Sequence, residues 1–273
     1  MDAKSFSPPP PIDAPAKLTP ETIAIPADRR RGDQPYEGPD RRGRSNQYCG
    51  KYSQSIPGAL DLQELANPQL TAELAAKAQG VNTRIKRALD IVLALSLLIA
   101  FAPVGLLVAI AIKLESKGPV LFRQTRVGLG GRTFDVIKFR SMRVDAERDG
   151  PQWAVKKDPR ATKVGDVIRR LHIDEVPQAV NILRGDMSFI GPRPERPEFV
   201  RTLENNVPSY RARLLVKPGL TGWAQVSYRY CETLEDAWLK LRYDLYYIRN
   251  FSVWTEVKIL FNTVRVVIFG LRI

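Results

Sequence analysis

Two adjacent carboxylates, Asp174 and Glu175, are the residues whose types and spacing in this chain best suit chemistry. They open a short helical pattern whose apolar positions would share one face, namely Ile173, Val176, Val180 and Leu183. Asp174 suits the N-cap of that helix, where the positive end of the helix dipole would keep its carboxylate ionised. A carboxylate of this kind can act as a covalent nucleophile. The simpler interpretation is that Asp174 only caps the helix and Glu175 is a first-turn acid.

Positive charge is concentrated in the later part of the chain. The formal net charge is +13, and residues 1–80 hold ten basic and ten acidic residues, so the whole excess belongs to residues 81–273. An excess of this size favours a polyanionic partner.

The chain has too few histidines and cysteines for most sites that depend on these residues. The single histidine, His172, rules out most histidine-based triads, and an isolated histidine is more often structural than catalytic. The two cysteines, Cys49 and Cys231, form neither a disulfide framework nor a metal-ligand spacing, which fits a reducing compartment. No secretory signal peptide is visible at the N-terminus.

Residues 1–80 differ from the rest in composition. They hold 11 of the 21 prolines, and residues 1–58 have the composition of a disordered segment, whereas residues 59–79 suggest one or two short helices. We therefore divide the chain into a Pro-rich, largely disordered region, 1–80, and a folded domain, 81–273.

Residues 88–112 form an apolar run long enough to enter a membrane, with Asp90 as the single charged residue. A helix that is apolar on all sides would otherwise need a larger protein around it. Basic residues flank both ends of the run, which places both ends in the cytoplasm. Pro103 would divide the helix into two legs, each too short to cross. We favour a kinked, re-entrant helix over residues 84–117, and the rival is a single span with a proline kink.

The remaining segments predict a mostly helical α+β domain. Residues 120–127 and 132–139 should form a β-hairpin around a glycine-rich turn, and residues 163–170 a short helix. Residues 197–211 are amphipathic with loop breaks, and residues 217–226 are rich in turns. Two C-terminal helices mix apolar, aromatic and basic residues, which suits either the membrane interface or core packing.

With these segments in place, the chain resembles the bacterial sugar transferase family, the monotopic polyprenyl-phosphate hexose-1-phosphate (phosphoglycosyl) transferases. The resemblance covers about residues 82–273 and rests on several ordered blocks. These are the apolar run with its proline, Gly118-Pro119-Val120, Phe122-Arg123-Gln124, Arg126-Val127-Gly128, Lys138-Phe139-Arg140-Ser141-Met142, Asp174-Glu175-Val176-Pro177-Gln178, Gly185-Asp186-Met187-Ser188, Gly191-Pro192-Arg193-Pro194 and Pro218 to Val226. The tail from Ser227 to Asp244 resembles members that initiate exopolysaccharide assembly.

The resemblance implies transfer of a sugar-1-phosphate from a UDP-sugar to undecaprenyl phosphate, with Mg2+ and release of UMP. Asp174 matches the nucleophile that forms a covalent phosphosugar intermediate, and Glu175 matches its partner at the metal or in proton handling. Arg193 would bind phosphate. Further candidate phosphate or substrate ligands lie in the matching blocks: Lys138, Arg140, Arg229, Arg123, Arg126 and Gln178.

The implied architecture is a monotopic protein of the bacterial inner membrane. Its re-entrant helix and amphipathic interfacial helices would surround a catalytic site on the cytoplasmic face, and a homodimer stays open. The usual Ser-Pro at the helix break reads Ala102-Pro103 here, and the common Asn-Gly-Arg reads Ser227-Tyr228-Arg229. The extra membrane spans of longer relatives are absent from these residues.

Two other classes of protein compete with the enzyme. A basic nucleic-acid-binding membrane protein would explain the charge, but no nucleic-acid-binding motif is present. A membrane-anchored adaptor would make residues 1–80 the working part. The transferred sugar is not specified, with glucose or galactose ahead of an N-acetylated hexose.

Overall fold

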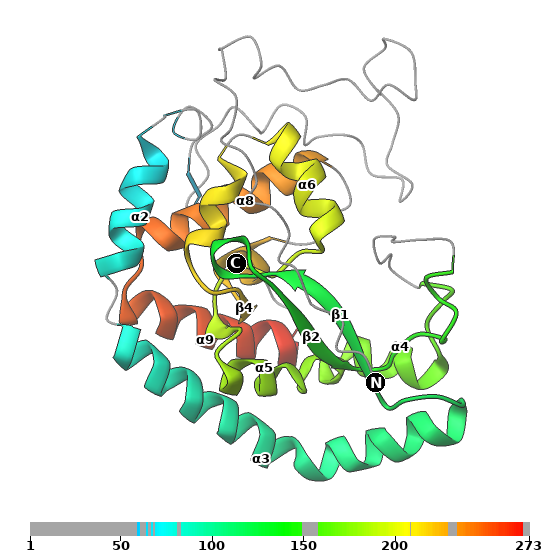
Figure 1. Ribbon diagram of the computed structural model, residues 1–273. Helices are drawn as coiled ribbons and strands as arrows, with labels where there is room; N and C mark the ends of the chain where they lie inside the picture. Colours follow the sequence, from blue (N-terminus) through cyan, green and yellow to red (C-terminus); the bar gives the residue numbers. More distant parts are fainter. Residues whose placement is uncertain are drawn as a thin grey trace, which may run out of the picture. The chain divides into compact units, whose positions relative to one another are not determined.

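A computed structural model divides the chain into two units, Met1–Gln47 and Tyr48–Ile273. It describes residues 59–60, 64, 67, 69–80, 83–148, 158–207, 209–228 and 234–269, all in the second unit (Figure 1). The disorder expected for residues 1–58 lies outside these ranges.

Helix α2, Leu70–Gly80, belongs to the folded unit. Its Leu70 and Leu74 are buried in the main hydrophobic cluster together with Leu241 and Leu245 of helix α8, Leu234–Arg249. The folded part therefore takes in residues that the sequence analysis had grouped with the Pro-rich region.

Helix α3, Thr83–Glu115, is the long apolar helix. It is continuous through Pro103, and Figure 1 shows it bending partway along its length. Proline lacks the N–H that would bond to the preceding turn, which is a common cause of such a bend. The segment Arg84–Glu115 is long and apolar enough to cross a membrane, and only 11% of its most apolar 18-residue stretch is buried inside the protein.

Both ends of α3 are bonded to the rest of the folded unit. Near its start, the buried Asp90 accepts hydrogen bonds from Ser188 Oγ at 2.9 Å and from the Phe189 N–H at 2.8 Å. At its end, Glu115 accepts from the backbone N–H groups of Lys163 at 2.7 Å and Val164 at 3.1 Å. The second pair caps the start of helix α4, Lys163–Arg170.

The predicted β-hairpin and short helix are confirmed. Strands β1, Leu121–Val127, and β2, Thr133–Phe139, pair antiparallel from Leu121 opposite Phe139 to Val127 opposite Thr133. The short 3-10 helix η2, Leu129–Gly131, makes the turn, and Gly130 and Gly131 both have positive φ. This turn therefore requires glycine.

Several short elements follow α4. They are the 3-10 helix η3, Ile173–Glu175; helix α5, Gln178–Arg184; strand β3, Ser188–Ile190; helix α6, Pro197–Asn206; the 3-10 helix η4, Tyr210–Leu215; strand β4, Gly219–Thr221; and helix α7, Trp223–Ser227. Strands β3 and β4 pair in parallel. This second sheet was not predicted. At the end of this sheet the two backbone segments lie so close together that a Cβ on Gly191 would be 2.4 Å from the carbonyl oxygen of Lys217.

The two C-terminal helices have different environments. Helix α8 is a core helix, with Leu241, Arg242, Leu245 and Ile248 all almost fully buried. Of the two alternatives for this helix, membrane interface or core packing, the structure therefore shows core packing. Helix α9, Val253–Phe269, buries Glu256 and Ile259 on one side only.

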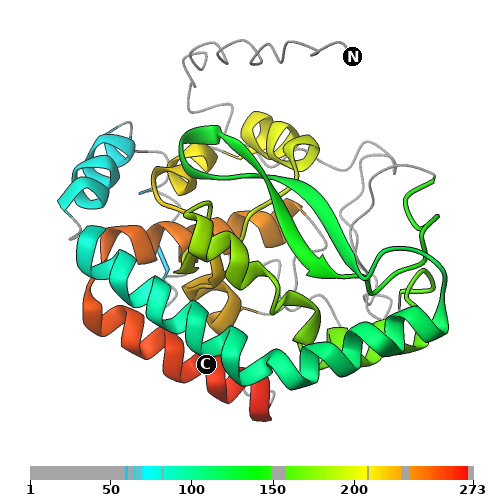
Figure 2. The same ribbon diagram turned by 60° about the horizontal axis from the view of Figure 1, so that its bottom comes forward.

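Helices α3 and α9 lie on the same side of the folded unit (Figure 2), and both expose apolar side chains. The exposed fraction is 74% at Ile99 of α3 and 65% at Phe261 of α9. The other exposed apolar side chains of this surface are Ile85, Leu89, Val92, Leu95, Val104, Leu106, Leu107, Ile110, Leu114, Val253, Trp254, Val257, Val264 and Val267. An apolar surface of this extent is unusual for a soluble monomer.

Candidate active site

The two carboxylates lie in η3, between α4 and α5. The exposed His172 has a φ of 57° and turns the chain from α4 into η3. Asp174 does not cap α5, so that prediction is wrong. The residue before α5 is Pro177, which offers no side-chain cap.

The buried face of α5 is not the predicted apolar one. Gln178, Ala179, Asn181 and Ile182 are buried, whereas the predicted face is only half-buried. This face is buried because Asn181, which is fully buried, hydrogen-bonds α5 to the edge of β2. Its Oδ1 accepts from the Ile137 N–H at 3.0 Å, and its Nδ2 donates to the Asp135 carbonyl at 2.7 Å. This pairing holds β2 beside the carboxylates.

Glu175 is surrounded by cations. Lys138 of β2 donates to its Oε1 at 3.0 Å, and Arg193 makes two bonds, one of them to Oε2 at 3.1 Å. Burial alone would raise the pKa of Glu175, but the charges of Arg193 and Lys138 outweigh it and hold that pKa well below its usual range. Glu175 is therefore a fixed anion that holds two cations in place.

Asp174 has the opposite surroundings. It is 8% exposed, and its carboxylate makes no hydrogen bond or ion pair with the residues that the structure describes. Burial, followed by repulsion from Glu175, raises its pKa to about 6. At pH 7 the carboxylate is still ionised by roughly ten to one. It is a buried, ionised carboxylate that no described side chain neutralises directly.

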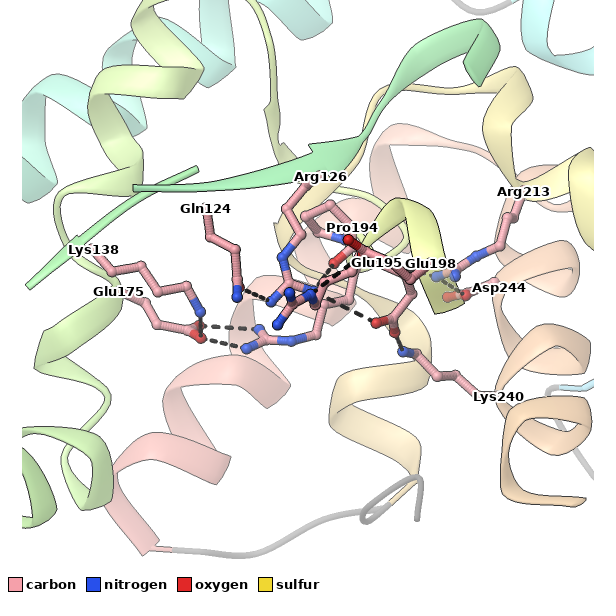
Figure 3. A network of polar contacts seen from close by, with 12 residues as sticks. Gln124, Arg126, Lys138, Glu175, Pro194, Glu195, Glu198, Arg213, Lys240 and Asp244 are labelled. Atoms are coloured by element: carbon pink, nitrogen blue, oxygen red, sulfur yellow. Dashed lines mark hydrogen bonds and ion pairs between the residues drawn. The ribbon is translucent and has the colours of Figure 1, made fainter. Parts of the chain in front are cut away.

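The loop that carries Arg193 is held by polar contacts from β1 and α8, and Figure 3 shows those of Arg126 and Lys240. Arg126 of β1 donates to the Pro194 carbonyl at 3.3 Å, and Lys240 of α8 pairs with Glu195. The Val127 N–H also donates to the Glu195 carbonyl at 2.9 Å. This loop is therefore fixed against the hairpin and α8.

The other predicted site residues are only partly brought together. Arg140 is buried and donates to the carbonyls of Ser116 at 2.9 Å and Lys117 at 3.0 Å, so it holds the end of α3. Arg123 is exposed and has no partner among the described residues. Gln178 is buried at the start of α5. Arg229 lies outside the described residues.

Arg169 is a candidate that the sequence analysis missed. It lies in the last turn of α4, is half-buried, and its side chain has no partner in the described part of the chain. Its charge is among those that lower the pKa of Asp174. The signal was its place one helical turn before the carboxylates, next to Arg170.

The donor set limits what kind of metal site could form. Within the described ranges, no group of three or more His, Cys, Asp or Glu side chains could hold a metal ion. Mg2+ is usually held by one or two carboxylates together with substrate phosphates. The unpartnered carboxylate of Asp174 fits such an ion, whereas Glu175 is already engaged by two cations. The residues therefore suit a metal ion that a phosphorylated substrate helps to hold.

Comparison with known proteins agrees with the family suggested by the motifs. Residues 81–270 match the family described as bacterial sugar transferase. A UDP-N-acetylgalactosamine-undecaprenyl-phosphate N-acetylgalactosaminephosphotransferase of Aeromonas hydrophila is 44% identical over 218 residues, 80% of this chain and 51% of that protein. A UDP-glucose:undecaprenyl-phosphate glucose-1-phosphate transferase of Escherichia coli is 46% identical over 187 residues, 68% of this chain and 40% of that protein.

A shorter relative is matched over most of its length. The exopolysaccharide production protein PSS of Rhizobium leguminosarum is 44% identical over 186 residues, 66% of this chain and 93% of that protein. The chain thus spans about half or less of the two longer relatives.

Proposed function

This chain belongs to the bacterial sugar transferase family, and from that premise we propose that it transfers a sugar-1-phosphate from a UDP-sugar to undecaprenyl phosphate. The names of the relatives support this reaction and a link to exopolysaccharide production, and we place the reaction at the first membrane step of that synthesis. They include both N-acetylgalactosamine and glucose donors, so the sugar is to be decided by experiment.

Asp174 is the proposed nucleophile, and its buried, unpartnered carboxylate is the observation that carries the proposal. An oxygen of Asp174 attacks the β-phosphorus of the donor, and the bond to the bridging oxygen breaks. UMP leaves with that electron pair. A phosphate oxygen of undecaprenyl phosphate then attacks the aspartyl phosphosugar, which returns the free carboxylate and leaves the sugar on a lipid diphosphate.

The neighbouring charges have separate roles in this proposal. Glu175 holds Arg193 and Lys138 together, and these cations stabilise negative charge on the donor phosphates. Arg169, without a described partner, is free to take a second phosphate. A bound Mg2+, held by Asp174 and substrate oxygens, would further neutralise the diphosphate.

The membrane arrangement is also a proposal. The contacts of Asp90 and Glu115 tie the two ends of α3 to one folded unit, and the exposed apolar residues of α3 continue onto α9. A straight span would carry one end about 30 Å away, across the bilayer. These contacts support a bent helix that enters and leaves the cytoplasmic face of the inner membrane, where a lipid acceptor meets a soluble donor.

The reaction is tested with protein purified in nanodiscs with Mg2+ and undecaprenyl phosphate. UMP release is measured for UDP-glucose, UDP-galactose and UDP-N-acetylgalactosamine. We expect release with at least one donor and none above background from Asp174→Asn. The matched control is Asp166→Asn, which removes an exposed carboxylate of α4 and should keep full activity. Normal UMP release by Asp174→Asn would reject Asp174 as the nucleophile, whereas absence of UMP release from the wild type with every donor would favour a non-catalytic adaptor.

Topology is tested by labelling single cysteines in a variant whose native Cys49 and Cys231 are replaced by serine. Arg84→Cys and Lys117→Cys mark the two exposed ends of α3. We expect a membrane-impermeant thiol reagent to label neither position in intact cells and both in inside-out vesicles. Labelling of one position in spheroplasts would favour a single span.

A further inference from the structure

Arg213 of η4 lies behind the site and contacts three different groups. It is 4% exposed, and its Nη2 donates to the backbone carbonyl of Arg193 at 2.8 Å. Its Nη1 donates to the Tyr210 hydroxyl at 2.6 Å, and Asp244 of α8 lies 2.8 Å from its Nη2 (Figure 3). The ion pair with Asp244 compensates the buried charge of Arg213, and the two hydrogen bonds satisfy Nη1 and Nη2, whereas Nε is buried without a hydrogen-bond partner among the described residues.

The loop from Gly191 to Arg196 is held partly by such polar contacts. It borders a small hollow that is also lined by Val127, Arg213 and Pro218. The polar contacts of Arg126 and Lys240 hold residues 194 and 195, on the far side of Arg193. Among the hydrogen bonds described for the loop, that of Arg213 is the one made to the backbone of Arg193.

We propose that Arg213, seated by Asp244 and Tyr210, is a positioning residue that sets the backbone of Arg193, so that the Arg193 guanidinium reaches Glu175 and the donor phosphates. The inference rests on the proposed transferase function. Arg213 acts through Arg193, since its own donors end on the Arg193 carbonyl, Tyr210 and Asp244.

The geometry favours arginine over lysine at position 213. The guanidinium presents several N–H donors in a rigid plane, and Arg213 uses them toward a carbonyl, a hydroxyl and a carboxylate at once. Lysine would keep the positive charge beside Asp244, but it cannot reproduce the fixed fork. Arg213→Lys therefore removes the positioning while it leaves the buried charge compensated.

The test is a double-mutant cycle in kcat/KM for UMP release, with Arg213→Lys combined with Arg193→Lys. We expect Arg213→Lys alone to lower kcat/KM about tenfold or more, and to lower it less than about twofold once Arg193 is already lysine, because residues that act as a unit are non-additive. The same factor in both backgrounds, or no loss in the wild-type background, would overturn the inference.

Two controls keep the outcome decisive. Arg249→Lys alters an arginine of α8 that pairs with Glu64 and Glu73 on the surface, and it should leave kcat/KM unchanged in both backgrounds. If Arg213→Lys does not fold, as judged by thermal unfolding, Tyr210→Phe removes only the contact to Nη1 and is read by the same criterion of non-additivity. Failure of the proposed function is separate, because it appears as absent UMP release from the wild type.

Discussion

The candidate site has two sides that differ in how their charges are compensated. On the side of β2 and the 191–196 loop, Glu175, Arg193, Lys138, Glu195 and Lys240 are all ion-paired. On the side of α4, Asp174 and Arg169 have no partner among the described residues, although Asp174 is buried.

This difference separates rigidity from reactivity. Paired charges in a buried network fix side-chain positions, and breaking a pair leaves an uncompensated charge. An unpartnered buried carboxylate costs stability but keeps its lone pairs available for a substrate. Adjacent residues can thus have opposite roles because their surroundings push their pKa values apart.

The largest expected effect is on the paired side. Glu175→Gln should destabilise the fold by about 3 kcal/mol, because Lys138 and Arg193 would lose their shared counter-ion. The pKa of Glu175 is lowered in the fold, so this loss should be full above about pH 4.5 and shrink as the pH falls. Chemical denaturation at pH 7 and pH 4 would measure it, and an unchanged midpoint would contradict the role given to the pairing.

A somewhat smaller effect is expected for the unpaired cation. Arg169→Ala should lower kcat/KM about a hundredfold, or about 2.7 kcal/mol, because a phosphate ligand is lost. Its thermal midpoint should stay within a few degrees, since no described interaction is removed. Arg170→Ala is the matched control, because the exposed neighbour pairs only with Asp166 on the surface. Loss of stability without loss of activity would reverse the comparison.

The smallest expected effect has the opposite sign. In the presence of a chelator, Asp174→Asn should stabilise the fold by about 1–2 kcal/mol at neutral pH, because a buried charge is removed. The folded pKa of about 6 lies above the ordinary value of 3.8, so the wild type loses stability as the pH rises between them. The gain should therefore vanish near pH 4. Denaturation midpoints across this range test the sign, and a destabilised variant at pH 7 would show that Asp174 has a structural partner.

Local patterns predicted several elements well. The hairpin and α4 could be predicted from the alternation of side chains along the strands, the glycines of the turn and the helical spacing of apolar residues. All of these signals act within a few residues. The apolar character of α3 was equally visible, and the helix that contains Pro103 bends partway along its length.

Long-range partners decided what local patterns could not. Arg140 looked like a phosphate ligand, but the carbonyls that it binds lie in the segment that ends α3. The buried face of α5 is set by Asn181, which hydrogen-bonds to the backbone at the edge of β2, and a local pattern cannot show that partner. Helix α8 carries more charged residues than α9, yet tertiary packing buries α8 and leaves one side of α9 exposed. Strands β3 and β4 are three residues each, too short for alternation to be recognised.

The contacts at the start of α3 can form only late in the synthesis of the chain. Lys86 pairs with Glu256, and Arg87 donates to the Leu183 carbonyl at 2.7 Å, so both partners emerge from the ribosome long after the helix itself. Since chains are made at about 5–20 residues per second, α3 waits roughly ten seconds or more for Glu256. During that interval the apolar helix has to be kept from aggregating, and its final anchoring is a late event of biogenesis.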